Sequence, residues 1–295
     1  MQLLHSATRN YSWGSRTLIP HLQGQPDADK PIAELWFGAH PGDPSTVDGR
    51  LLNEVIAEDP AGQLGSRVSA EYGERLPFLL KVLAAEEPLS LQAHPSKSQA
   101  EEGFARENAS GIELTASNRN YKDDNHKPEL IVALTDFYAM AGFRPLAQTR
   151  ELFAALGCPE LDHYVAMLDD DPSAATESAN LRVLFTTWIT IPSAKRKELI
   201  GAIIAAGERL ISADADDWKS RVMSTVLDLN QRYPGDIGVL GALLLNHIEL
   251  SPGEAVYLDA GQLHAYVSGL GVEIMANSDN VLRGGLTPKF VDVPE

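Results

Sequence analysis

The hydrophobic positions of the chain change pattern along its length. Residues 1–50 place short apolar segments between turn-forming residues, which predicts strands of a β scaffold. Residues 51–75 predict one or two helices, and the apolar runs at 76–83, 89–94 and 129–134 predict further strands. The first half of the chain is therefore expected to be mainly β.

A different period begins at Pro145 and lasts to Tyr233. Apolar residues there recur at i, i+3, i+4 and i+7, for example at Leu181, Leu184, Phe185 and Trp188. The Tyr233-Pro234-Gly235 sequence ends the last predicted helix, and a strand is predicted again at Ala255–Leu258. We predict a mainly β fold with an α insertion.

The predicted division follows from these patterns. Residues 1–144 and 236–295 form the β domain, and residues 145–235 form an inserted α-helical domain.

Composition narrows the class of protein. The 295 residues are 44% hydrophobic and 22% charged, which excludes a disordered chain, a coiled coil and a collagen-like fibre. With 24 basic and 41 acidic residues the net charge is −17, which disfavours nucleic acid and anionic membranes as partners. No obligate protein partner is evident.

Location and redox state follow from a few features. The N-terminus lacks a basic segment followed by a long apolar run, and no apolar stretch is long enough to span a bilayer, so a cytoplasmic location is expected. The single cysteine, Cys158, excludes an intrachain disulfide and a cysteine-rich metal cluster.

Four polar residues are candidate metal ligands. Gln92 and His94 lie two residues apart on a predicted strand and so share a face. His264 follows a glycine turn, a strand and a second glycine turn at Gly261, a pattern by which cupin barrels present a metal ligand. Glu129 begins an apolar strand, where it either faces the barrel interior with a metal or faces solvent at the strand end. Together these oxygen and nitrogen donors suit Zn²⁺, Mn²⁺ or Fe²⁺.

Arg283 is a candidate anion-binding residue. It precedes Gly284 and Gly285, which let the backbone approach a ligand closely, and a guanidinium binds anions in bidentate fashion.

Several phrases resemble the type I mannose-6-phosphate isomerase family, and they occur in family order from residue 11 to residue 289. They are Tyr11-Ser12-Trp13-Gly14, Ala33–Pro41, Pro88–Pro95, Asn125-His126-Lys127-Pro128-Glu129, Gly261–Tyr266 and Ser278–Lys289.

This resemblance implies a cupin-type jelly-roll β-barrel with one Zn²⁺ per chain, which interconverts D-mannose 6-phosphate and D-fructose 6-phosphate. It implies zinc ligation by the four candidate ligands and an essential active-site role for Arg283. Lys127, Glu273 and Asp279 match other polar residues of that pocket, and one or more of them would transfer the proton between C1 and C2. Trp13 belongs to the first of the matching phrases and is assigned to the substrate pocket.

Two lysines are further candidates. Lys289 and Lys97 could assist Arg283 in binding the phosphate of a phosphorylated hexose.

Two other functions fit parts of the pattern: an Fe(II) cupin oxygenase, and a sugar-phosphate-binding cupin without catalysis.

Family members usually continue into a C-terminal β domain, which is absent from these 295 residues. Either the chain is a naturally short member or its C-terminal portion is missing.

Overall fold

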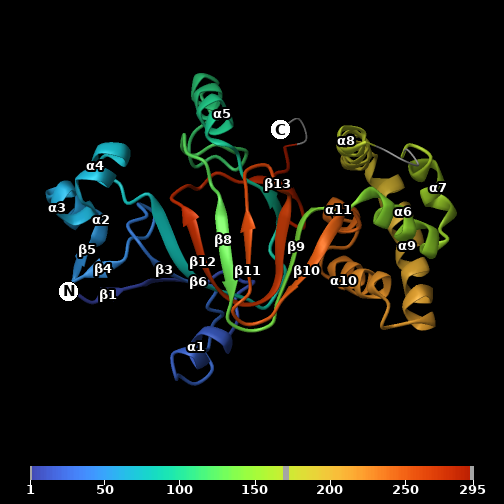
Figure 1. Ribbon diagram of the computed structural model, residues 1–295, viewed down its shortest axis with the longest axis horizontal. Coiled ribbons are helices and arrows are strands. Elements are labelled where there is room, and N and C mark those ends of the chain that lie inside the picture. Colours follow the sequence, from blue (N-terminus) through green and yellow to red (C-terminus); the bar gives the residue numbers. More distant parts are fainter. Residues whose placement is uncertain (1, 169–172, 293–295) are drawn as a thin grey trace.

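The computed structural model describes residues 2–168 and 173–292 and has an antiparallel β-barrel at its centre (Figure 1). One long strand, β12 (His264–Ala276), lies in the middle and has two sets of neighbours. Its first part pairs with β9 (Phe137–Phe143) and β7 (Leu91–Ala93). Its second part pairs with β6 (Phe78–Ala85) and β8 (Glu129–Ala133).

The remaining barrel strands extend these two groups. They are β10 (Leu245–Leu250) beside β9, β13 (Leu282–Gly285) beside β7, β11 (Ala255–Leu258) beside β8, and β3 (Glu34–Phe37) followed by β2 (Ala7–Arg9) beside β6. Each of β10, β2, β11 and β13 pairs with one strand and ends a branch of this sheet.

A bend in β12 separates its two groups of partners. The pairing with β9 shifts between Tyr266 and Ser268, and Gly269 follows with φ of 125°. A Cβ at Gly269 would lie 2.8 Å from the Cα of Phe137, so only glycine fits this corner. The bend lets one strand supply side chains to both parts of the barrel.

An N-terminal lobe lies on the left in Figure 1. It contains a small sheet of β1 (Leu4–His5), β4 (Thr46–Val47) and β5 (Arg50–Leu51), and three short helices, α2 (Leu52–Glu58), α3 (Pro60–Leu64) and α4 (Ser66–Tyr72). The helical prediction for residues 51–75 is confirmed, with three helices in place of one or two. Two other helices flank the barrel: α1 (Leu18–Leu22), and α5 (Lys97–Ala109), which starts with a capping box at Ser96.

The helices on the right of Figure 1 come from the segment with helical periodicity. They are α6 (Leu146–Leu156), α7 (Pro159–Val165), α8 (Ala174–Thr190), α9 (Ser193–Ala213) and α10 (Trp218–Arg232), followed by α11 (Ile237–Ala242). The predicted stripe is buried at Leu181, Leu184 and Trp188. It packs with Met140 and Ala265 of the barrel strands in one hydrophobic cluster, so burial of apolar surface holds the helices against the sheet.

The fold prediction is confirmed in its main features. The structure has a barrel with a helical segment between its strands, and the strands predicted at 76–83, 89–94, 129–134 and 255–258 correspond to β6, β7, β8 and β11. Within the two described ranges, no helix is both long and apolar enough to cross a bilayer.

Candidate metal centre and active site

Three of the predicted metal ligands meet at one end of the barrel. His94 directly follows β7, Glu129 begins β8 and His264 begins β12. One possible ligand atom from each residue lies within 4.8 Å of those of the other two. All three residues are buried, so their polar atoms are shielded from water.

The atoms that face one another lack other partners. The Nε2 atoms of His94 and His264 and the Oε2 atom of Glu129 are buried and make no hydrogen bond to a described residue. His94 Nε2 lies 3.1 Å from Glu129 Oε1, and His264 Nε2 lies 3.4 Å from Glu129 Oε2. Burying such atoms is costly unless something binds them, and a cation between the three would do so.

Both histidine rings are oriented for a metal. His94 Nδ1 donates to the carbonyl oxygen of Asn280 at 2.9 Å, and His264 Nδ1 donates to that of Gln262 at 2.9 Å. Because each Nδ1 carries the proton, each Nε2 presents a lone pair. The set of two imidazoles and one carboxylate fits Zn²⁺.

Protonation states agree with metal binding. Burial lowers the pKa of His94 to about 4, so the ring is neutral at pH 7. Burial alone would raise the pKa of Glu129, but His94 and Lys127 outweigh it and hold that pKa well below its ordinary value. His94 and Glu129 are therefore unprotonated at pH 7 and ready to ligate.

Strand register places Gln92 beside these ligands. Gln92 lies directly opposite His264 on β12, and opposite Arg283 on β13. Directly opposed residues of antiparallel strands project from the same face. Gln92 and Arg283 therefore share the face that carries His264.

Two cations lie close to this centre. Lys127 is buried, and its Nζ is 3.3 Å from Glu129 Oε1. Arg283 is half-buried, burial lowers its pKa, and no carboxylate of the described chain pairs with it. An unpaired guanidinium beside a metal centre is suited to an anionic ligand.

Glu273 belongs to a buried network that was not predicted from the sequence. Its Oε1 accepts a hydrogen bond from the hydroxyl of Tyr266 at 2.9 Å, and its Oε2 lies 3.2 Å from Nζ of Lys81. Lys81 also bonds Glu34 Oε1 at 3.2 Å, and Glu34 Oε2 accepts from Nε1 of Trp36. Burial raises the pKa of Glu273, with Lys81 opposing that shift.

The strands explain this network. Trp36, Lys81 and Glu273 lie opposite one another on β3, β6 and β12, so their side chains line up on one face. The sequence signal was a single charged residue within an apolar run, at Lys81 in Leu79–Leu83 and at Glu34 in Ile32–Trp36.

Two other predicted site residues, Asp279 and Lys97, line a cavity whose lining includes neither the three metal donors nor Arg283. Asp279 lies 3.3 Å from Nε2 of the buried His40, and that hydrogen bond lowers the pKa of Asp279. Lys97 is exposed and already pairs with Glu101 and Asp124. The cavity that they line has a volume of about 830 Å³.

Lys289 and Trp13 differ in exposure. Lys289 is exposed. Partial desolvation of its amine and the positive charges of Arg283 and Lys122 lower its pKa, so these three cations lie near one another. Trp13 is half-buried, stacks on Tyr11 and packs against the hydrophobic cluster inside the barrel.

Asn280 holds the loop that supports His94. Its side chain is fully buried, with Oδ1 accepting from the N–H groups of Lys122 and Asp123 and Nδ2 donating to the carbonyl oxygens of Asp123 and Asn125. The main-chain oxygen of Asn280 then orients His94. In the sequence, Asn280 is only one polar residue within the longer phrase Ser278–Lys289.

Comparisons with known proteins identify the family of this chain. Residues 1–146 match the model of the phosphomannose isomerase type I catalytic domain. The chain is 41% identical to the mannose-6-phosphate isomerase of Escherichia coli K12 over its whole length, and covers 73% of that protein. The chain belongs to the type I phosphomannose isomerase family.

Other relatives of this family extend the likeness. The human mannose-6-phosphate isomerase is 37% identical over 99% of this chain, which covers 70% of the human protein. The Salmonella typhimurium enzyme solved with fructose 6-phosphate and zinc is 38% identical, with a TM-score of 0.86 over 100% of this chain and 72% of that one. A mannose 6-phosphate isomerase solved with zinc and yttrium has the same TM-score. Membership of this family removes support for an Fe(II) cupin oxygenase and for a non-catalytic cupin.

Proposed function

We propose that this chain is a zinc-dependent isomerase that interconverts D-mannose 6-phosphate and D-fructose 6-phosphate. The observation that carries the proposal is the set of three buried, unpartnered donor atoms of His94, Glu129 and His264, within a chain of this family. Relatives of the same fold bind zinc and fructose 6-phosphate, which supports the same ligands here.

Gln92, His94, Glu129 and His264 would hold the zinc. Gln92 completes the set because its strand position gives it the same face as His264, and an amide oxygen is a compatible neutral ligand. A bound Zn²⁺ supplies Lewis-acid polarisation of substrate oxygens.

Arg283 would bind negative charge on the substrate. Its guanidinium is half-buried and pairs with no carboxylate of the described residues, so its charge is available to a phosphate or to the oxygens of an enediolate. Lys289 lies near Arg283 and adds positive charge on the same side. Lys97 is the weaker phosphate candidate because Glu101 and Asp124 already share its amine, and Trp13 would line the pocket.

Proton transfer requires a base that takes the proton from C2 of the aldose and returns it to C1, while a hydroxyl proton moves from O2 to O1. Glu273 and Lys127 are the strongest candidates. Glu273 is a buried carboxylate with a raised pKa, and Lys127 touches the metal centre. Asp279 is the weakest base of the three because His40 lowers its pKa.

We also propose an organisation and a location. Residues 1–144 with 236–295 would form the catalytic barrel domain, and residues 145–235 an inserted helical domain, because the helices pack on the outside of the barrel. A cytoplasmic location is supported by the single, buried cysteine.

The test is metal content and a coupled isomerase assay on one sample, after chelation and after zinc is restored. We expect activity on mannose 6-phosphate to disappear with the metal and to return with Zn²⁺. Zinc bound without isomerisation would favour a sugar-phosphate-binding protein, and absence of stoichiometric metal would refute the proposal.

A variant pair tests the role of Arg283. Arg283→Ala should retain zinc and lose turnover by about two orders of magnitude or more, because the developing negative charge loses its partner. Arg232→Ala is the matched control, since Arg232 is half-exposed and pairs with Glu87 and Asp228 on another part of the molecule. Near-normal turnover of Arg283→Ala would overturn this assignment.

A further inference from the structure

A second pocket lies outside the barrel, between its outer face and the helices. Its volume is about 540 Å³. One wall comes from β9 and β10, the opposite wall from α10, and one end from Arg144 and α6. None of the predicted metal ligands or active-site residues lines it.

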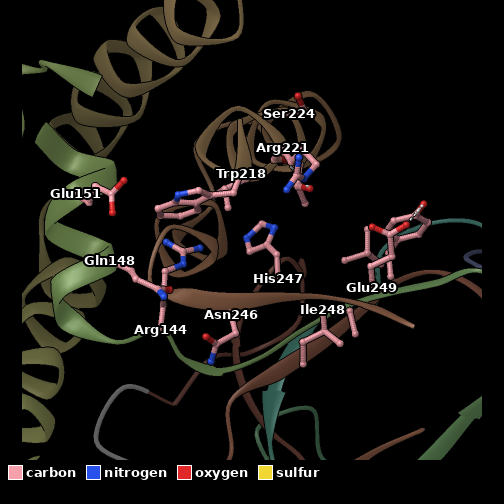
Figure 2. A pocket seen from close by; sticks show the side chains of 15 residues that line it. Arg144, Gln148, Glu151, Trp218, Arg221, Ser224, Asn246, His247, Ile248 and Glu249 are labelled. Carbon is pink, nitrogen blue, oxygen red and sulfur yellow. Dashed lines mark hydrogen bonds between the residues drawn. The ribbon is translucent and has the colours of Figure 1, made fainter. Parts of the chain in front are cut away.

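Strand geometry separates the two sites. Val267 of β12 lines the outer pocket, whereas His264 is three residues earlier and faces the metal centre. Figure 2 shows His247 and Glu249 pointing from β10 toward α10, and Asn246 and Ile248 pointing to the other side of the strand.

The pocket contains a buried arginine, Arg144, that pairs with no carboxylate of the described residues. Arg144 is 3% exposed and donates from its two terminal nitrogens to the carbonyl oxygens of Leu243 and Leu245, at 3.0 and 2.7 Å. Its guanidinium lies 5.4 Å from the ring centre of Trp218, and no carboxylate in the described chain pairs with it. Burial lowers its pKa to about 10, so the group stays charged at pH 7 and gives the pocket a positive wall.

Two other side chains converge on the same space. His247 Nε2 donates to the carbonyl oxygen of Ala242 at 3.0 Å, so Nδ1 is left as an acceptor without a partner in the described chain. Arg221 of α10 is exposed and uses one nitrogen on the main chain of Asp216, which leaves the rest of its guanidinium for a ligand. Figure 2 shows His247 between the guanidinium groups of Arg144 and Arg221.

The remaining walls are partly polar and partly apolar. Glu151 and Glu249 also line the pocket, and each already accepts a hydrogen bond, Glu151 from Nζ of Lys219 at 3.1 Å and Glu249 from the hydroxyl of Tyr138 at 3.2 Å. Trp218, Val222 and Val267 face the pocket, so a flat apolar group can pack there while an anionic group meets the arginines.

We propose that this pocket binds a small organic anion with a flat apolar part. Its phosphate or carboxylate contacts Arg221 in the positive field of Arg144, its apolar part packs against Trp218, and a hydroxyl group donates to Nδ1 of His247. Neither the metal centre nor the proposed isomerase activity is needed for this binding.

The test is calorimetric titration of the full chain with phenyl phosphate and, separately, with benzoate. The first probe carries a phosphate and the second a carboxylate, so the two arms show which anion the pocket prefers. We expect saturable binding of at least one probe. Arg221→Gln should weaken it about tenfold, because a charge-assisted contact is lost.

Two variants locate the site. Arg209→Gln is the control variant. Arg209 is an exposed arginine of α9 that, like Arg221, donates to a nearby main-chain oxygen, so this variant should bind the probes as the wild type does. Arg283→Gln removes the anion-binding residue of the proposed active site and should also leave binding unchanged within about twofold. Failure of both probes to bind, or binding that Arg283→Gln abolishes and Arg221→Gln spares, would overturn the proposal.

Discussion

Replacement of Asn280 by alanine should damage both the stability of the protein and its affinity for metal. The side chain makes hydrogen bonds of 2.7 and 3.2 Å to the N–H groups of Lys122 and Asp123, and of 2.8 and 2.9 Å to the carbonyl oxygens of Asp123 and Asn125. Each net contribution is about 1 kcal/mol, and water reaches part of this loop, so we expect a loss of about 3 kcal/mol. That corresponds to a fall in melting temperature of about 5–10 °C for a domain of this size.

The metal effect has a separate cause. Asn280 also provides the main-chain oxygen that holds the His94 ring, so a displaced loop releases that ring. Loss of such an outer hydrogen bond typically weakens metal binding about 10–100-fold.

Thermal unfolding of metal-free protein measures the first effect, and competition with a zinc chelator measures the second. Asn10→Ala is the control, because Asn10 is exposed and makes one hydrogen bond, to the carbonyl oxygen of Pro31. An Asn280→Ala protein with the melting temperature and zinc affinity of the wild type would refute the reasoning.

Three further predictions follow from the site and the fold. Gln92→Ala should weaken zinc binding less than His264→Ala, because a neutral amide is the poorer donor; chelator competition measures both, and an unchanged zinc affinity of Gln92→Ala would exclude Gln92 as a ligand. Burial lowers the pKa of His247 to about 4, so unfolded protein binds the extra proton and stability falls as pH drops from about 6.5 to about 4. When the pH falls from 7 to 5, the free energy of unfolding of His247→Gln should therefore decrease by about 2 kcal/mol less than that of the wild type. Urea unfolding at the two pH values measures this, and equal decreases would contradict the prediction. Gly269→Ala should cost at least about 2 kcal/mol, whereas Gly201→Ala, on an open face of α9, should be neutral or stabilising; equal stabilities in urea would contradict the steric argument.

The metal centre could be predicted from sequence because its residues carry local signals. Gln92 and His94 share a strand face, and Gly261 indicates a turn before His264. The resemblance to a family then related these distant segments to one another, and the structure brings His94, Glu129 and His264 together.

The buried network could not be predicted in the same way. Lys81, Glu34 and Glu273 are adjacent only because β3, β6 and β12 pair in one particular register. A shift of one residue would turn these side chains to the other face, and sequence periodicity does not give the register of distant strands.

The sequence contains still fewer local patterns that would predict the outer pocket. His247 donates to a main-chain carbonyl oxygen, that of Ala242, as ordinary structural histidines do. Its closeness to Arg144 and Trp218 depends on how the helices pack against the sheet, which no local pattern encodes.

The order of the metal donors along the chain has a consequence for biosynthesis. His94 and Glu129 precede helices α6–α10, whereas His264 and the supporting Asn280 follow them. A chain made from its N-terminus cannot complete the donor set until the whole helical segment has been synthesised. Bringing His264 to His94 and Glu129 closes a long loop, and this step is slow because the chain loses conformational entropy before the contacts form. Zinc capture is therefore a late event in maturation, and a ribosome-bound chain that ends before residue 264 should hold the metal no better than an unfolded peptide.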